Sequence, residues 1–237
     1  MDVFSFTKQD LHKMTVYCYD VLLNHFDTNY KLVTPILSQK YIAFPLFITI
    51  NNPSKTNKLR GCIGTFTKDS TKTIFSHLKK YTIQTAFHDS RFTNNHITKD
   101  ELKDTELSIS LLYSDVECKS LDDWNIGTDG IKISFTHNER QYSGTYLPEV
   151  AQEQSWDKMT TIKNLIQKTG YSQEITDEFL QNIKLIKYSS NKYTLSFKDY
   201  KKYKNNIIAN SLHNIKFDTN NLLRFFTYSG AIYLLFI

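Results

Sequence analysis

Two long stretches of this chain carry apolar residues at helical spacing. The first is 7–26, where the hydroxyl of Thr7 is placed to cap the start. The second predicts a helix that begins at Ser70 or Thr71 and runs to about Phe87. Each helix has one apolar face, so each is expected to cover a hydrophobic core.

Shorter helices are predicted from residue types that begin or end helices. Thr98 and Glu101 have the spacing of a capping box. Pro148 is suited to a first helical position, which needs no N–H. A helix near 161–169 is expected to end at Gly170, a residue type common just after helices.

Strands are predicted at 44–50, 59–66, 106–113, 130–135 and 140–147. Apolar and polar residues alternate most clearly in 106–113 and 130–135, while 44–50 is rich in residues that favour strands. The turn-rich segment 51–58 joins the first two as a hairpin, and 130–135 pairs with 140–147 in the same way. "LIKYS" and "YTLSF" around "SNK" predict a last hairpin. Helices and antiparallel hairpins interleave without a repeated βαβ unit, so the predicted class is α+β.

Composition describes a globular protein from a reducing compartment. The 237 residues make one sizeable domain or a domain with a subdomain, with 40% hydrophobic residues. The beginning of the chain is polar, which argues against a signal peptide. Cys18, Cys62 and Cys118 are odd in number and far apart, which argues against a disulfide framework. A cytoplasmic or nuclear location is therefore expected, and the cysteine and histidine spacing argues against a structural zinc site.

The net charge of +5 belongs to the C-terminal end. From Lys184 onward there are nine basic and two acidic residues, while the rest of the chain is slightly acidic. This distribution weakens a nucleic-acid interpretation. Of 29 basic residues only four are arginines, namely Arg60, Arg91, Arg140 and Arg224. We hypothesise that these few mark places where a planar, bidentate group is needed.

The last residues differ in character from the main body, 1–204. Residues 205–221 hold six asparagines and predict a linker. Residues 222–237 are apolar but include Arg224, and a membrane span needs about 20 apolar residues. The tail is interpreted as an accessory helix or strand, as an extension peculiar to this chain, or as a membrane anchor.

Four motifs together carry a resemblance to a known family. They are "LRGCIGTF" at 59–66, "DSRF" at 89–92, "WNIGTDGIKI" at 124–133 and "YLPEVAQEQSWD" at 146–157. In order and spacing they resemble the AMMECR domain, over roughly 10–204. Family members usually continue through prolines after "DSRF", whereas this chain has "TNN". The resemblance implies an antiparallel sheet flanked by helices, in two lobes with the motifs at a cleft between them. It also implies a functional association with a Memo-type protein and a radical-SAM enzyme, with no settled reaction or cofactor.

The "RGCIG" segment contains the first candidate chemistry. Gly61 and Gly64 lack Cβ atoms, so a ligand or another backbone can approach the strand closely. Strand alternation places Arg60 and Cys62 on one face, where a guanidinium favours the thiolate and holds an anionic substrate. The alternative is that Cys62 is a small buried residue and Arg60 pairs with a carboxylate.

Acidic residues in two other motifs supply further candidates. Asp89 can orient Arg60 or Arg91 and leave the other free for a phosphate or carboxylate; alternatively it forms a local salt bridge. If 148–157 is one helix, Glu149 shares a face with Glu153 and Asp157. Glu149 is then a candidate acid–base or metal contact, and the alternative is a solvated acidic face.

These observations leave the function open between three classes. The leading hypothesis is an AMMECR-domain protein whose cleft binds a small anionic molecule for group transfer or hydrolysis. The alternatives are a non-catalytic module that docks a Memo-type or other protein, and an adaptor that contacts RNA or DNA.

Overall fold

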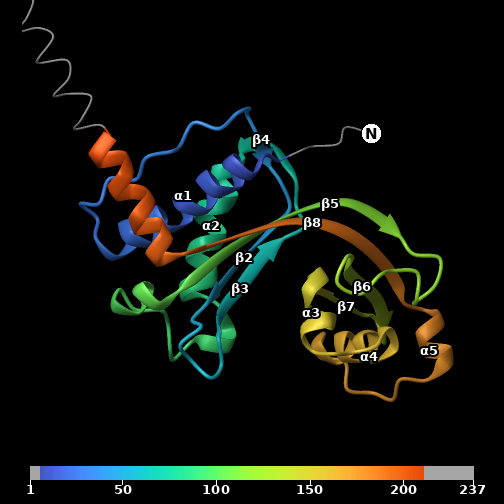
Figure 1. Ribbon diagram of the computed structural model, residues 1–237. Coiled ribbons are helices and arrows are strands. Elements are labelled where there is room, and N and C mark those ends of the chain that lie inside the picture. Colours follow the sequence, from blue (N-terminus) through green and yellow to red (C-terminus); the bar gives the residue numbers. More distant parts are fainter. Residues whose placement is uncertain (1–5, 211–237) are drawn as a thin grey trace, which may run out of the picture.

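The computed structural model describes residues 6–210, which form a curled sheet with one group of helices near each end of it (Figure 1). The six antiparallel strands lie in the order β3-β2-β5-β8-β6-β7. Their bounds are β2 (Leu46–Asn51), β3 (Leu59–Thr65), β5 (Glu106–Glu117), β6 (Gly130–His137), β7 (Arg140–Tyr146) and β8 (Lys184–Ser196). The α+β class predicted from the sequence is confirmed.

Two separate hydrophobic clusters divide the fold into two lobes. In the first lobe, α1 (Lys8–Phe26) and α2 (Ile74–Phe87) cover one face of β2, β3 and β5. In the second, α3 (Pro148–Glu153), α4 (Lys158–Lys168) and α5 (Asp177–Gln181) lie by β6, β7 and the start of β8. Ile48 and Leu107 belong to the first cluster, and Ile133 and Leu165 to the second.

The remaining elements complete the first lobe. A two-stranded sheet pairs β1 (Ile42–Ala43) with β4 (Asp69–Thr73), and two 3₁₀ turns, η1 (Ser90–Phe92) and η2 (Asp100–Asp104), follow α2. Residues 197–210 continue from β8 as a helix. Asp20 accepts hydrogen bonds from Tyr200 and Lys204, which fixes this helix to α1.

The sheet curls until its edge strand approaches distant strands. Phe66 follows β3, yet its ring lies 5.5 Å from the ring of Tyr188 on β8. The ammonium of Lys132, on β6, lies 4.6 Å from the Phe66 ring centroid. Three strands separate β3 from β6 in the sheet order, so these contacts require strong curvature.

The face of the sheet turned away from the helices carries a polar row. Cys62, Thr49, Ser108 and Thr194 are successive cross-strand partners and therefore share one face. Their neighbours Ile48 and Ile109 point the other way, into the first core. Cys62 thus stands at the β3 end of a row of hydroxyl side chains.

Most predicted elements are confirmed, and the start of α2 needs correction. The Thr7 side chain caps α1 as expected, by accepting a hydrogen bond from the Asp10 N–H at 3.1 Å. Helix α2 begins at Ile74 rather than at Ser70 or Thr71, because residues 69–73 pair with β1 as strand β4.

The predicted last hairpin around "SNK" is wrong. Residues 184–196 form the single strand β8, and Asn191, in the middle of the supposed turn, pairs with Leu111 of β5. Strand β5 is nearly as long as β8, so it offers pairing partners on both sides of the polar segment. Ladder hydrogen bonds therefore outweigh the local turn preference of Ser and Asn.

The two C-terminal segments predicted at 205–221 and 222–237 lie mostly outside the described residues. Residues 205–210 continue the helix that begins at 197, and the apolar tail is not described. Among residues 6–210, no helix is both long and apolar enough to cross a membrane.

Candidate functional site

The open edge of β3 is closed at Cys62 by an ion pair from "DSRF". The Cys62 N–H donates to Oδ2 of Asp89 at 2.9 Å, and Nη2 of Arg91 donates to the Cys62 carbonyl at 3.2 Å. Asp89 and Arg91 are joined to each other by bonds of 2.6 and 2.9 Å. The pair therefore occupies the place of a neighbouring strand at this residue, which joins two of the motifs physically.

Arg91 is only partly used by these contacts. Its side chain is 49% exposed, and its bonds to Asp89 and to Cys62 are made by Nε and Nη2. Within residues 6–210, its Nη1 makes no hydrogen bond. Hydrogen bonds from Arg91 and from the Cys62 N–H lower the pKa of Asp89 against the opposing effect of burial. Asp89 therefore remains a carboxylate that fixes the direction of the guanidinium.

Arg60 does not join this group. Strand β3 has an irregular register here, since Leu59 pairs with Asn51 while Gly61 pairs with Ile50, which leaves Arg60 as the extra residue of a bulge. A bulge breaks strand alternation, so the predicted common face of Arg60 and Cys62 fails.

The guanidinium of Arg60 is instead buried in a network of its own. It is 3% exposed and donates to both carboxylate oxygens of Glu101, at 2.7 and 3.2 Å, and to the carbonyl of Asn95 at 2.8 Å. Burial alone would raise the pKa of Glu101, but hydrogen bonds from Arg60, Asn52 and Lys55 lower it to about 2. Arg60 therefore pairs with a carboxylate, as in the alternative to substrate binding given in the sequence analysis.

The close approaches predicted at Gly61 and Gly64 are made by the protein itself. A Cβ atom on Gly61 would lie 2.2 Å from the Thr85 carbonyl oxygen of α2. On Gly64 it would lie 2.1 Å from the carbonyl oxygen of Leu46 and against the Phe47 ring. These glycines allow α2 and β2 to pack closely on β3, and both positions are filled without any ligand.

The Cys62 thiol is half-buried and held mainly in its neutral form. Burial raises the pKa of the thiol, while the hydroxyl of Thr49, which donates to Sγ at 3.3 Å, lowers it. The charges of Arg91 and Lys168 also lower it, and burial outweighs them together. The free protein therefore holds no strongly activated thiolate at this position.

Lys168 is a site residue that the sequence analysis missed. It stands in the last turn of α4, and its ammonium donates to the Thr145 carbonyl at 2.9 Å and lies 4.5 Å from the Tyr146 ring centroid. Protein atoms crowded around the ammonium lower the pKa of Lys168, and the charge of Arg91 lowers it further. No local motif marks this lysine, because only the curl of the sheet brings α4 toward β3.

The three acidic residues of the last motif do not share a helix face. Helix α3 ends at Glu153, Ser155 adopts a left-handed conformation with φ of 56°, and Asp157 caps the separate helix α4. Glu149 pairs with Lys192 of β8. The predicted acidic face is therefore wrong. Among the residues described, no group of three His, Cys, Asp or Glu is arranged to hold a metal ion.

Comparisons with other proteins extend the picture. A model of the AMMECR1 family matches residues 15–193. An uncharacterised protein of Arabidopsis thaliana is 33% identical over 196 residues, which cover 81% of this chain and 87% of that protein. One from Saccharomyces cerevisiae is 33% identical over 175 residues, or 68% of each chain. The crystal structure of an uncharacterised protein from Pyrococcus horikoshii matches with a TM-score of 0.63 at 20% identity, over 78% of this chain and 90% of that one.

The fold and the closed strand edge define a two-lobed α+β domain in which "LRGCIGTF" and "DSRF" meet at Cys62. The family match covers most of the chain and contains the segments on which the resemblance was based. The chain belongs to the AMMECR1 family. The similar proteins named above are themselves described as uncharacterised, so the function must be argued from the site.

Proposed function

We propose that this protein binds a small molecule through its anionic group, such as a phosphate or carboxylate, at Arg91 and Lys168 beside Cys62. The observation that carries the proposal is the geometry of Arg91, which donates to the Cys62 carbonyl at 3.2 Å, is held by Asp89 and remains 49% exposed. Lys168, from the other lobe, adds a second positive charge that acts to lower the pKa of the Cys62 thiol. Arg91 follows α2 in the first lobe, and Lys168 ends α4 in the second. In this proposal, Arg91 and Lys168 face each other across the cleft that was expected between the lobes.

The chemistry of the two side chains suits an anion. Arg91 is held in orientation by Asp89 while much of its guanidinium remains in contact with solvent. An oriented fork loses less conformational freedom when it binds a planar or tetrahedral oxyanion. Because the charges of Arg91 and Lys168 repel each other, an anion between them relieves an unfavourable interaction as well as adding favourable ones.

We propose that Cys62 lines the bottom of the site as a small, uncharged side chain. A nucleophilic cysteine needs a depressed pKa, whereas burial raises that of Cys62. Group transfer or hydrolysis through this sulfur would therefore require the bound ligand to expose or activate it. Binding without covalent chemistry is the reading that the thiol supports best.

Inorganic phosphate is a suitable probe for the experiment. The full chain is titrated by calorimetry, with Trp156 fluorescence as a second readout, because the Trp156 ring lies 5.7 Å from that of Tyr146, which contacts Lys168. Saturable binding is expected, weakened at least tenfold by Arg91→Gln and by Lys168→Gln, since hydrogen bonds to charged groups contribute about 1.5–3 kcal/mol.

Two controls separate the site from general charge and from the thiol. Lys163→Gln removes an exposed cation from the same helix and should leave phosphate affinity unchanged. Cys62→Ser should also keep it. The proposal is wrong if the wild-type protein shows no saturable binding, or if Lys163→Gln weakens binding as much as Lys168→Gln does.

A further inference from the structure

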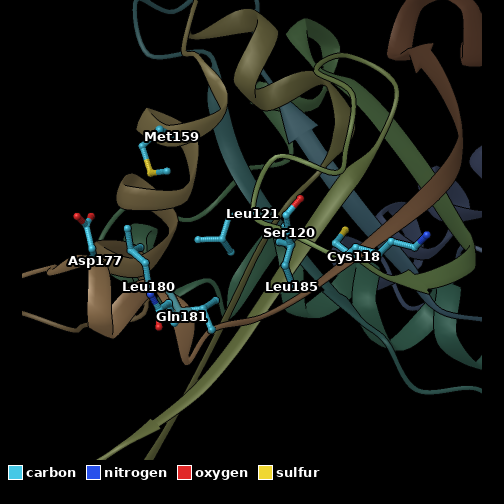
Figure 2. Close-up of a pocket in the computed structure, with 10 residues that line it drawn as sticks. Cys118, Ser120, Leu121, Met159, Asp177, Leu180, Gln181 and Leu185 are labelled. Carbon is cyan, nitrogen blue, oxygen red and sulfur yellow. The ribbon is translucent and has the colours of Figure 1, made fainter.

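A cavity of about 410 Å³ opens in the second lobe, and none of the four sequence motifs lines it (Figure 2). Its walls come from the loop after β5, from α4, from α5 and from the start of β8. Small-molecule sites in proteins have volumes of about 300–1,000 Å³, so this cavity falls within their range.

One wall of the cavity is fixed by hydrogen bonds within the loop after β5. The Cys118 thiol donates to the Asp123 carbonyl at 3.3 Å, and the Lys119 N–H donates to the Asp123 carboxylate at 3.1 Å. Trp124 Nε1 donates to the Leu121 carbonyl at 3.0 Å, and Lys187 forms an ion pair with Asp123. These contacts hold the concave shape without a ligand, so little ordering is needed for binding.

The lining is mixed, with polar and apolar atoms exposed to similar extents, and it includes two sulfur-containing side chains. The apolar and thiol side chains are Cys118, Leu121, Met159, Leu180, Ile183 and Leu185. Met159 is 42% exposed, and Leu121 and Leu180 are only half-buried, so apolar surface remains in contact with water. A ligand that covers this surface gains the hydrophobic contribution to binding. The thioether of Met159 also favours an aromatic ring, because sulfur–aromatic contacts are attractive.

The rim of the cavity carries polar groups without a dominant charge. Lys119 and Asp177 contribute one charge of each sign. The side-chain amide of Gln181 forms no hydrogen bond with a residue in 6–210, so a donor and an acceptor remain available there. A neutral ligand with one hydrogen-bonding group matches this rim better than an ionised one.

We propose that this cavity is a binding site for a neutral fused-ring aromatic molecule of about the size of indole or a purine base. A site of about 410 Å³ that is open to solvent on one side lies within the size range of small-molecule sites and leaves room for two fused rings with a polar substituent. The site is separate from the anion site proposed above, and neither depends on the other.

Methionine NMR gives a direct test with indole as the probe. The chain has three methionines, Met1, Met14 and Met159, so a methyl-labelled sample of the full chain gives a simple spectrum. Ring currents from bound indole should shift the Met159 methyl signal in a saturable way. Met14 is fully buried in the first lobe and should not respond.

A matched pair of variants distinguishes the cavity from non-specific contact. Gln181→Trp places an indole side chain at the rim and should weaken the Met159 response to added indole at least tenfold. Gln173→Trp makes the same change at an exposed position that does not line the cavity, and should leave the response unchanged. An absent or non-saturating Met159 shift, or an equal response in both variants, would overturn the proposal.

Discussion

The two arginine–carboxylate pairs beside β3 have the same chemistry and opposite exposure. Arg60 with Glu101 is buried, at 3% and 10% side-chain exposure, whereas Arg91 with Asp89 leaves the arginine 49% exposed. Each guanidinium carbon lies 5.6 Å from the centroid of the Phe92 ring. The buried pair has little surface left for a ligand, and the exposed one does. Residue type and motif membership therefore do not distinguish a structural arginine from a binding one, but burial does.

The largest expected effect comes from breaking the buried pair. Arg60→Ala leaves the Glu101 carboxylate and the Asn95 carbonyl without their main donor, so the free energy of unfolding should fall by about 3–5 kcal/mol. Urea denaturation followed by circular dichroism measures it. Arg140→Ala, at an exposed arginine of β7, is the control and should change stability by no more than about 0.5 kcal/mol. Equal stabilities in the two variants would contradict the assigned role.

A somewhat smaller loss is expected where β3 meets α2. Gly61→Ala introduces a Cβ atom 2.2 Å from a backbone oxygen of Thr85, so the helix must shift away from the strand. Overpacking of this kind typically costs about 1–3 kcal/mol, measured by thermal or urea unfolding. An unchanged midpoint would mean that α2 does not press on β3 in solution.

Acid should weaken the buried pair specifically. The folded-state pKa of Glu101 is about 2, below its usual value of 4.5, so the pair stabilises the protein fully above about pH 4.5. That contribution is lost as the pH falls from 4.5 toward 2. In Arg60→Ala this part of the pH dependence should be reduced, as stability curves between pH 2 and pH 6 would reveal. If the stability curves of the wild type and of Arg60→Ala ran parallel between pH 2 and pH 6, this role of the Arg60–Glu101 pair would be contradicted.

The smallest effect on stability is expected at the exposed pair. Arg91→Gln should lower the free energy of unfolding by less than about 1 kcal/mol, because solvent screens a half-exposed ion pair. The same variant is expected to lose phosphate affinity. Substitution of Arg60 should therefore have the larger effect on stability, and substitution of Arg91 the larger effect on phosphate binding. A large loss of stability in Arg91→Gln would make it a structural residue like Arg60.

Local sequence patterns predicted most elements and the family, but not the grouping at the site. Helix α1 and its Thr7 cap follow from short-range spacing. The bulge at Arg60 does not, because the irregular register arises between two strands. The charge of Lys168 acts on Cys62 only because curvature accumulates over the whole sheet, and no window of sequence contains that information.

Strand β8 has a mechanical consequence for the molecule. Its residues 186 and 187 have neighbours on both sides, since Lys187 pairs with Val116 of the first lobe and with Ile131 of the second. The two lobes are therefore joined through one continuous, hydrogen-bonded strand rather than through a flexible linker. For the two lobes to move apart, the hydrogen bonds between these strands must break or the whole sheet must bend. The stiffness of the sheet therefore sets the distance between Arg91 and Lys168.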